Sequence, residues 1–506
     1  MLNYIKGIIK GPIKKILLWT EKTTPPKKIK FSPESPIKNV HIQKYITLIF
    51  VYVSLVLTIS FELKLRSIGI LGVVIFFAVV MLLVVIYLKK SFNEFINDDS
   101  SVILIGVVLI FVVFLSGVLK KYGFSAWAIP TPSVAVLVTL LVSPEIAIIS
   151  SLVISIFLGF LSGFSIHVCL FSFLGCIVGI FTSAKVKNRY DFIKIGYYII
   201  LTNASVLISL WLLEGWDVKL FLSSVLCGVI NGIFSIVLSS TFLPYLEKFF
   251  SKTTSIRLLE LGDFNQPLLR RFMLEAPGSY HHSLMVASLS ESAADVVGAN
   301  PLLCRVGAYY HDVGKIVRPE YFIENQSAIL SKHEDLKSQM SSLIIISHVK
   351  EGERIMNEYG IGKVVTDIVR QHHGTSLVRY FYMKALEHGI TDSDEDVYRY
   401  PGPRPKTKES AIVMLADSVE AAARTMAKPS LNRLEQLIRK ITQSKLHDGQ
   451  LDESELTLAD LEKIVRAFTQ VLASVYHYRI EYPKAEVRPF KRRLVARGNP
   501  NRQLSK

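Results

Sequence analysis

The strongest constraint on the fold of this chain is a series of hydrophobic runs from Tyr45 to Phe250, separated only by short polar breaks. A helix needs roughly 20 apolar residues to cross about 30 Å of hydrocarbon. Runs of this kind are found at 45–61, 68–88, 102–119, 126–142, 145–163, 165–184, 194–213 and 218–245. The sequence therefore predicts a transmembrane helical domain of about eight spans over residues 45–250.

The distribution of charge predicts the orientation of this domain. The formal net charge is +16, and most of the excess lies in the first 44 residues, with ten lysines, and in the tail from Arg479, with nine lysines or arginines. Basic segments beside a membrane domain favour the cytoplasmic side and anionic lipid rather than a nucleic-acid polymer. Eight spans starting inside also return the C-terminal half to the cytoplasm. We expect basic cytoplasmic segments at 1–44 and 482–506.

The four cysteines do not indicate a disulfide framework. Cys169, Cys176 and Cys227 lie within hydrophobic runs, and Cys304 is the single cysteine of the C-terminal half. This usage is typical of a chain whose soluble part faces a reducing compartment.

From Ser251 onward the composition becomes charged and typical of soluble helices. Residues 251–275 predict a connecting helix, and the sequence Ala276-Pro277-Gly278 predicts a break before a domain at 276–481. Apolar residues recur at helical spacing over 282–297, 340–356, 364–373 and 411–427, whereas alternating strand patterns are not evident. The predicted fold class is all-α: a polytopic membrane domain followed by a helical domain.

Seven residues of this domain have the chemistry of transition-metal ligands. Imidazole and carboxylate groups suit ions such as iron or manganese. Seven ligands are too many for one catalytic ion that keeps positions open, but they suit two ions bridged by one carboxylate, for which we choose Asp312. The candidates are His282, His311, Asp312, His348, His372, His373 and Asp417. The pattern predicts a binuclear metallohydrolase, with each ligand projecting from a different helix.

Each candidate has a simpler explanation when it is taken alone. An adjacent His-Asp pair is common, and a lone histidine such as His348 is more often structural. His282 is preferred to His281 because it shares the inward face of its helix with Val286 and Leu289. Two consecutive histidines, and Asp417 within an apolar stretch, are costly to bury without a partner. The argument for a metal centre therefore depends on all seven occurring together.

The flanking segments "EAPGSYHHSLMVA", "YYHDVGKIVRPEYFIENQ", "RQHHGTS" and "KESAIVMLADSVEAAAR" resemble the HD-domain cyclic di-AMP phosphodiesterases, bacterial seven-transmembrane receptors with an intracellular HD hydrolase. The resemblance implies a multi-pass protein of the bacterial cell membrane, with a cytoplasmic domain that hydrolyses cyclic di-AMP to pApA. It also implies the same seven metal ligands. One feature departs from this family: only Glu62–Ser67 separate the first two spans, where relatives usually carry a large extracellular domain.

The substrate is expected to contact residues that follow His311-Asp312. Asp312 would bridge the ions and orient the nucleophile, and Lys315 would steady a phosphate, although a lysine extending from a helix surface is nearly as good an explanation. Arg318 and 321–326 would line the nucleotide pocket. A homodimer is also compatible with the sequence.

Three other functions remain open at this point. A mononuclear HD nucleotidase needs only the H…HD…D set, which would leave His348 and the His372-His373 pair without a role. A cyclic di-GMP phosphodiesterase of the HD type would carry a Gly-Tyr-Pro motif after the paired histidines, and here Gly374-Thr375-Ser376 follows instead. A membrane receptor whose HD domain only binds a nucleotide would lack some of the ligands.

Overall fold

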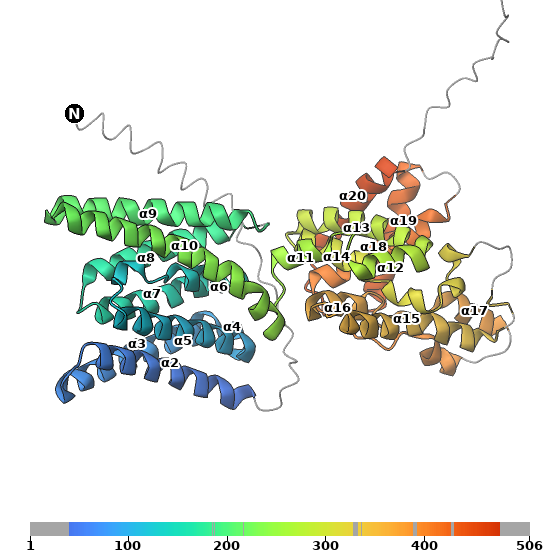
Figure 1. Ribbon diagram of the computed structural model, residues 1–506. Coiled ribbons are helices and arrows are strands. Elements are labelled where there is room, and N and C mark those ends of the chain that lie inside the picture. The colour runs from blue at the N-terminus through green and yellow to red at the C-terminus, as the bar shows by residue number, and fades with distance from the viewer. Residues whose placement is uncertain are drawn as a thin grey trace, which may run out of the picture.

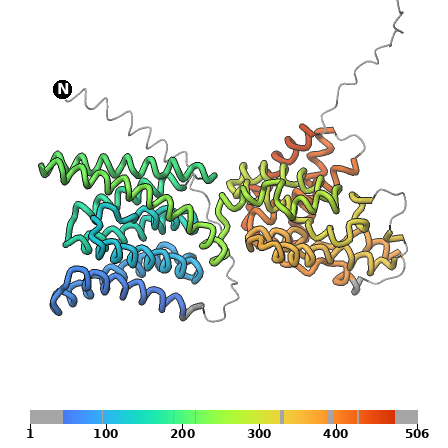
Figure 2. The backbone as a smooth tube through the Cα atoms, viewed as in Figure 1, coloured from blue at the N-terminus to red at the C-terminus, as the bar shows by residue number. Residues whose placement is uncertain are grey.

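The computed structural model describes residues 40–475 except 185, 187, 216, 327–331, 335, 388–391 and 427–429. The predicted basic segments therefore lie almost entirely outside the described residues. Two helical bodies lie side by side, a membrane bundle and a C-terminal domain (Figures 1 and 2). The described residues form helices throughout, and β-type pairing among them is limited to one bridge between Leu377 and Arg399. The predicted all-α fold class is confirmed.

The membrane bundle contains nine α-helices and one 3-10 turn among the described residues. Seven of these helices are long and apolar enough to cross a bilayer. The elements are α2 (Val40–Glu62), α3 (Ser67–Ser91), α4 (Asn93–Asn97), α5 (Asp99–Lys121), η1 (Ala126–Ala128), α6 (Pro132–Leu141), α7 (Pro144–Leu161), α8 (Ile166–Ser183), α9 (Asp191–Glu214) and α10 (Val218–Phe249).

The span predicted at 126–142 is wrong as a continuous helix. Pro130 and Pro132 lack backbone N–H donors, and the chain forms η1, a short non-helical stretch and α6. The ten residues of α6 cover about 15 Å, half of the hydrocarbon thickness. The Ile129 carbonyl in this non-helical stretch is buried and accepts two hydrogen bonds, one from the backbone N–H of Thr131 and one from the Asn231 side-chain amide of α10.

The chain nevertheless traverses the bundle an even number of times between α2 and α10. Ion pairs place the starts of α2 and α5 and the end of α10 at the end nearest the C-terminal domain: Lys44 lies 2.7 Å from Asp99, and Lys252 lies 2.8 Å from Asp98. The loop before α9 lies at the same end, since Arg189 contacts Glu260 at 2.7 Å. The 122–143 segment therefore carries the chain from the far end of α5 back to the near end, where α7 begins (Figure 1).

The C-terminal domain packs around α18, whose residues 410–417 are all buried. α13 packs against α14, α18 and α20, so it lies at the centre of the domain. The elements are α11 (Ser255–Leu261), α12 (Pro267–Glu275), α13 (Pro277–Val297), α14 (Pro301–Tyr310), η2 (Val313–Val317), η3 (Pro319–Tyr321), η4 (Ile323–Asn325), α15 (Ser338–Glu358), α16 (Lys363–Gln371), α17 (Arg379–Glu387), η5 (Asp392–Tyr398), α18 (Lys408–Arg424), α19 (Leu431–His447) and α20 (Leu458–Val475).

The connecting helix predicted at 251–275 is two helices, α11 and α12. The chain turns between them over 262–266, where the Asp263 carboxylate accepts a hydrogen bond from the backbone N–H of Asn265. Pro267 then starts α12 at a position where its missing N–H costs nothing. The predicted break is present: α12 ends at Glu275, and α13 starts at Pro277.

Candidate metal centre

The seven predicted ligands come from five segments of the C-terminal domain. His282, His348 and Asp417 project from within α13, α15 and α18. The other four lie just beyond helix ends: His311 and Asp312 follow α14, and His372 and His373 follow α16. The prediction that each ligand comes from a different helix is therefore wrong for these two pairs. A helix end allows both members of an adjacent pair to face one centre, which a continuous helix does not.

The segment after Asp312 lies unusually close to α15. A Cβ atom added to Gly314 would meet the His348 carbonyl oxygen at 1.9 Å and the Gly352 nitrogen at 2.5 Å. Only glycine permits this approach, because it lacks a side chain. The contact holds η2 against α15 and brings Asp312 to His348.

One group of three candidates surrounds Asp417. Its Oδ1 lies 3.0 Å from His282 Nε2 and 3.7 Å from His311 Nε2, and these two imidazoles and this carboxylate meet the spacing expected of shared metal ligands. His281, by contrast, is exposed, as its position on α13 predicts.

The second group joins Asp312 to three histidines. Asp312 Oδ1 lies 3.4 Å from His348 Nε2 and 3.8 Å from His372 Nε2. His373 belongs to the same group and also places its Nδ1 3.6 Å from Asp417 Oδ2.

Asp312 lies between the two groups. While its Oδ1 faces His348 and His372, its Oδ2 lies 3.3 Å from His311 Nε2 and 3.7 Å from His282 Nε2. One carboxylate thus offers one oxygen to each group of imidazoles. This is the arrangement required of a carboxylate that bridges two ions.

Hydrogen bonds fix the orientation of four imidazoles. Nδ1 of His311, His348 and His372 each faces the carbonyl oxygen three residues earlier, at Ala308, Ile345 and Val369, so Nδ1 carries the proton and donates. His282 directs its Nδ1 to the Glu420 carboxylate. Nε2 of each of these rings therefore faces the centre, where it can ligate an ion once it has no proton. Sequence reasoning missed Glu420, although it lies three residues after Asp417 on the inward face of α18.

Without a metal ion, the buried side chains of the cluster shift one another's pKa values in opposite directions. Burial opposes protonation of His311, but the Asp312 and Asp417 carboxylates raise its pKa to about 10. Burial and the neighbouring His311 and His348 lower the pKa of His372 to about 3. Burial would raise the pKa of Asp312, yet the charges of His311 and Lys315 hold it well below its ordinary value.

Two buried polar atoms at the centre, His311 Nε2 and Asp312 Oδ1, lack a hydrogen-bond partner among the described residues. Buried polar atoms of this kind cost free energy unless they are satisfied. A divalent ion ligated by these atoms would satisfy both, so the donor set fits one or two transition-metal ions.

Lys315 is held inside the site and does not extend from the surface. Its Nζ lies 2.7 Å from Asp312 Oδ2 and 2.8 Å from Glu324 Oε1, and it also faces the Phe322 ring. Burial disfavours the charged ammonium, but the two carboxylates raise the pKa of Lys315 above its ordinary value. Glu324, within the predicted 321–326 segment, in turn accepts a hydrogen bond from Ser279 on α13.

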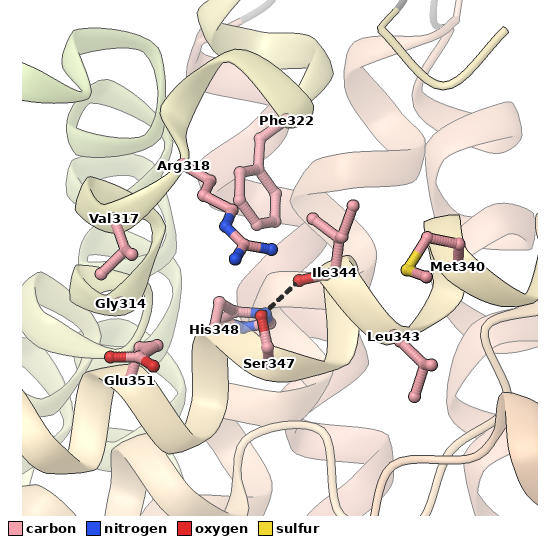
Figure 3. A pocket seen from close by; sticks show the side chains of 10 residues that line it. All are labelled: Gly314, Val317, Arg318, Phe322, Met340, Leu343, Ile344, Ser347, His348 and Glu351. Atoms are coloured by element: carbon pink, nitrogen blue, oxygen red, sulfur yellow. Dashed lines mark hydrogen bonds between the residues drawn. The ribbon is translucent and has the colours of Figure 1, made fainter. Parts of the chain in front are cut away.

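A pocket opens beside His348. The Arg318 guanidinium points into it toward His348, with Phe322 next to it (Figure 3). Val317, Met340 and Leu343 are exposed and give its rim an apolar surface. The pocket beside the cluster therefore combines one cationic side chain with an apolar rim.

Known proteins resemble this chain in both halves. Residues 67–254 match the family described as 7TM receptor with intracellular HD hydrolase, and residues 279–422 match the HD domain. Both halves of the chain are therefore similar to those of multi-pass membrane proteins with an HD hydrolase domain.

Several relatives carry names. A Bacillus subtilis protein named cyclic-di-AMP phosphodiesterase PgpH is 38% identical over 430 residues, which cover 82% of this chain and 60% of that protein. The Listeria monocytogenes protein of the same name is 43% identical over 254 residues, or 50% of this chain and 35% of that protein. A crystal structure of the Listeria HD domain in complex with cyclic-di-AMP is 44% identical, with a TM-score of 0.41, and covers 42% of this chain and 100% of that chain. The match therefore spans 60% of the Bacillus protein and 35% of the Listeria protein, so the chain covers less than two thirds of either relative.

Proposed function

We propose that this protein hydrolyses cyclic di-AMP to the linear dinucleotide pApA at a binuclear metal centre. The observation that supports this most strongly is the position of Asp312, whose two oxygens face two separate groups of imidazoles. The names of the two PgpH relatives support the substrate.

The metal ligands in this proposal are His282, His311, Asp312, His348, His372, His373 and Asp417. Two divalent ions, iron or manganese, would polarise the phosphodiester and lower the pKa of a water molecule so that hydroxide forms near neutral pH. The protein supplies imidazoles of fixed tautomer, a bridging carboxylate and an enclosed site that excludes bulk water.

The residues around the centre would bind and orient the substrate. Arg318 is placed to contact a phosphate or base that enters the pocket beside His348 (Figure 3). Lys315 keeps Asp312 ionised and in position through their ion pair, and we assign it a catalytic role on that ground. The apolar rim formed by Val317, Met340 and Leu343 would accept an adenine ring.

The domain organisation proposed with this function has five parts. They are a basic cytoplasmic segment at 1–44, the transmembrane domain at 45–250, the connection at 251–275, the hydrolase domain at 276–481 and a basic tail at 482–506. We place the hydrolase domain on the cytoplasmic side, because Lys89, Lys90 and Arg189 lie at the end of the bundle that faces it.

The deciding experiment is hydrolysis of cyclic di-AMP and cyclic di-GMP side by side by the purified full chain, supplied with iron, manganese or neither. We expect pApA from cyclic di-AMP, and only with metal. Preferential cleavage of cyclic di-GMP would favour the other phosphodiesterase, and tight binding without cleavage would favour a nucleotide receptor. Metal analysis should give two ions per chain.

A further inference from the structure

Lys445, in the last turn of α19, is a half-buried cation close to the metal centre. Its Nζ donates a hydrogen bond to Ser376 Oγ at 2.7 Å. Among the described residues it forms no ion pair with a carboxylate within 4.0 Å. The two carboxylates near enough to influence its charge have other partners: Asp417 contacts His282, and Asp448 contacts Arg399.

This arrangement leaves the charge of Lys445 largely uncompensated. Burial lowers the pKa of Lys445, and the charges of Asp417 and Asp448 offset only part of that effect. Lys315, beside Asp312, differs because Asp312 and Glu324 both lie within 3 Å of its ammonium group and balance its charge. A new anion is therefore stabilised more by Lys445 than by Lys315.

Ser376 belongs to the loop that carries the paired histidines, three residues after His373. A hydrogen bond fixes this loop, because the backbone N–H of Thr375 donates to the side-chain oxygen of Gln450 at 2.9 Å. Its other side contacts Tyr400, which stacks on the His373 ring with 4.3 Å between centroids. The Ser376 hydroxyl and the Lys445 ammonium are thus fixed beside the centre, and both can donate to one oxyanion.

We propose that Lys445 and Ser376 bind the phosphodiester of the substrate that is not being cleaved. This inference rests on the proposed function. A cyclic dinucleotide carries two negatively charged phosphodiesters in one small ring. When one of them lies at the metal centre, the other must lie a short distance away, next to a cation that is not already neutralised. Lys445 is such a cation, because its charge is felt by Asp417 of the centre and, in the described part of the chain, its ammonium group donates only to Ser376.

The test compares two substrates that differ in the number of phosphodiesters. Cyclic di-AMP has two, and bis(p-nitrophenyl) phosphate has one. For the full chain with metal bound, we expect Lys445→Met to raise KM for cyclic di-AMP by about tenfold to a hundredfold, the usual effect of losing a hydrogen bond to a charged group. We expect Ser376→Ala to raise it less. Neither variant should change KM for bis(p-nitrophenyl) phosphate by more than about twofold.

Lys440→Met is the matched control, because Lys440 is exposed on the same helix. Lys440→Met should leave KM unchanged for both cyclic di-AMP and bis(p-nitrophenyl) phosphate. All variants should have the metal content and the Tm of the unchanged protein. Equal loss with both substrates would overturn the inference, since it would assign Lys445 a structural role. An unchanged KM for cyclic di-AMP in Lys445→Met would overturn it as well.

Equilibrium binding of cyclic di-AMP to the metal-free full chain separates this inference from the proposed function. If the unchanged protein binds cyclic di-AMP but does not hydrolyse it when iron or manganese is supplied, and Lys445→Met weakens the metal-free binding relative to Lys440→Met, the phosphate site stands and the proposed function fails. If hydrolysis is normal and both variants bind equally, the function stands and the phosphate site fails. Absence of any binding and hydrolysis would overturn both.

Discussion

Nδ1 of His282 hydrogen-bonds to a carboxylate oxygen of Glu420, and both side chains are buried. A carboxylate at this position fixes the orientation of the ring, so that Nε2 points toward Asp417 and Asp312 and can ligate an ion once it has lost its proton. Glu420 thus positions a candidate ligand without facing the centre itself.

Glu420→Gln should therefore weaken metal binding by about 10- to 100-fold while the fold is retained. Competition with a chelator of known affinity measures the change. Glu453→Gln, at an exposed position, serves as the control. Equal metal affinities in the two variants would contradict the role assigned to Glu420.

Removal of the central carboxylate should abolish catalysis. Asp312→Asn leaves one oxygen that can ligate an ion, and we expect kcat to fall by at least about a thousandfold, equivalent to several kcal/mol of transition-state stabilisation. His311→Ala should have a similar effect. Asp295→Asn, an exposed change on α13, controls for folding, which circular dichroism would verify. Turnover near normal in Asp312→Asn would refute the site.

Metal binding should release protons at neutral pH. Because the pKa of His311 is raised to about 10, the metal-free protein holds a proton there that an ion must displace. Metal affinity should therefore fall as the pH is lowered. Calorimetry in two buffers of different ionisation enthalpy measures the protons released, and His311→Ala should release fewer. A binding enthalpy that is the same in both buffers would exclude this displacement.

The same raised pKa affects the stability of the metal-free protein. The folded state binds the His311 proton more tightly than the unfolded chain, in which the pKa is about 6.5. This contribution to the free energy of unfolding is fully present below that pH and is lost as the pH rises toward 10.

The close approach at Gly314 should be intolerant of a side chain. Gly314→Ala would force backbone atoms of η2 and α15 apart, because its Cβ would meet the His348 carbonyl. We expect a loss of about 1–3 kcal/mol in the free energy of unfolding, together with reduced metal content. Gly72→Ala is the control, since its Cβ would meet nothing within 4 Å. Unchanged melting and metal content in Gly314→Ala would show that the contact is dispensable.

Asn231 should stabilise the membrane bundle. Its amide donates to the Ile129 carbonyl, and Asn203 donates to its side-chain oxygen at 3.2 Å. Asn231→Leu should lower stability in detergent by about 1–2 kcal/mol, because the Ile129 carbonyl loses one of its two donors and keeps only the Thr131 N–H, and the Asn203 amide loses its acceptor on Asn231. Leu226→Ile, on an exposed face of α10, should have little effect on thermal unfolding. Equal melting of the two variants would contradict this role.

The sequence predicted those features that depend on residue type and periodicity. The buried face of α13, and with it the choice of His282 over His281, follows from helical spacing, and the seven candidates do lie together. The positions of Asp312 and Glu420 relative to the imidazoles depend on how helices pack, which periodicity does not report. Pro130 and Pro132 predict the break before α6, whereas the high hydropathy of 126–142 predicts one continuous span. The prolines decide the structure, because they lack the backbone N–H that a continuous helix needs. Lys445 was missed because it lies far from the ligands along the chain and carries no motif.

α10 has 32 residues and is about 48 Å long, whereas the hydrocarbon of a bilayer is about 30 Å thick. Part of it therefore extends beyond the lipid toward the C-terminal domain, and the Lys252–Asp98 ion pair ties its end to α5. Transmembrane helices respond to changes in bilayer thickness by tilting. Residues 250–254 connect α10 to α11, so a change in the tilt of α10 would change the angle at which the chain enters the C-terminal domain.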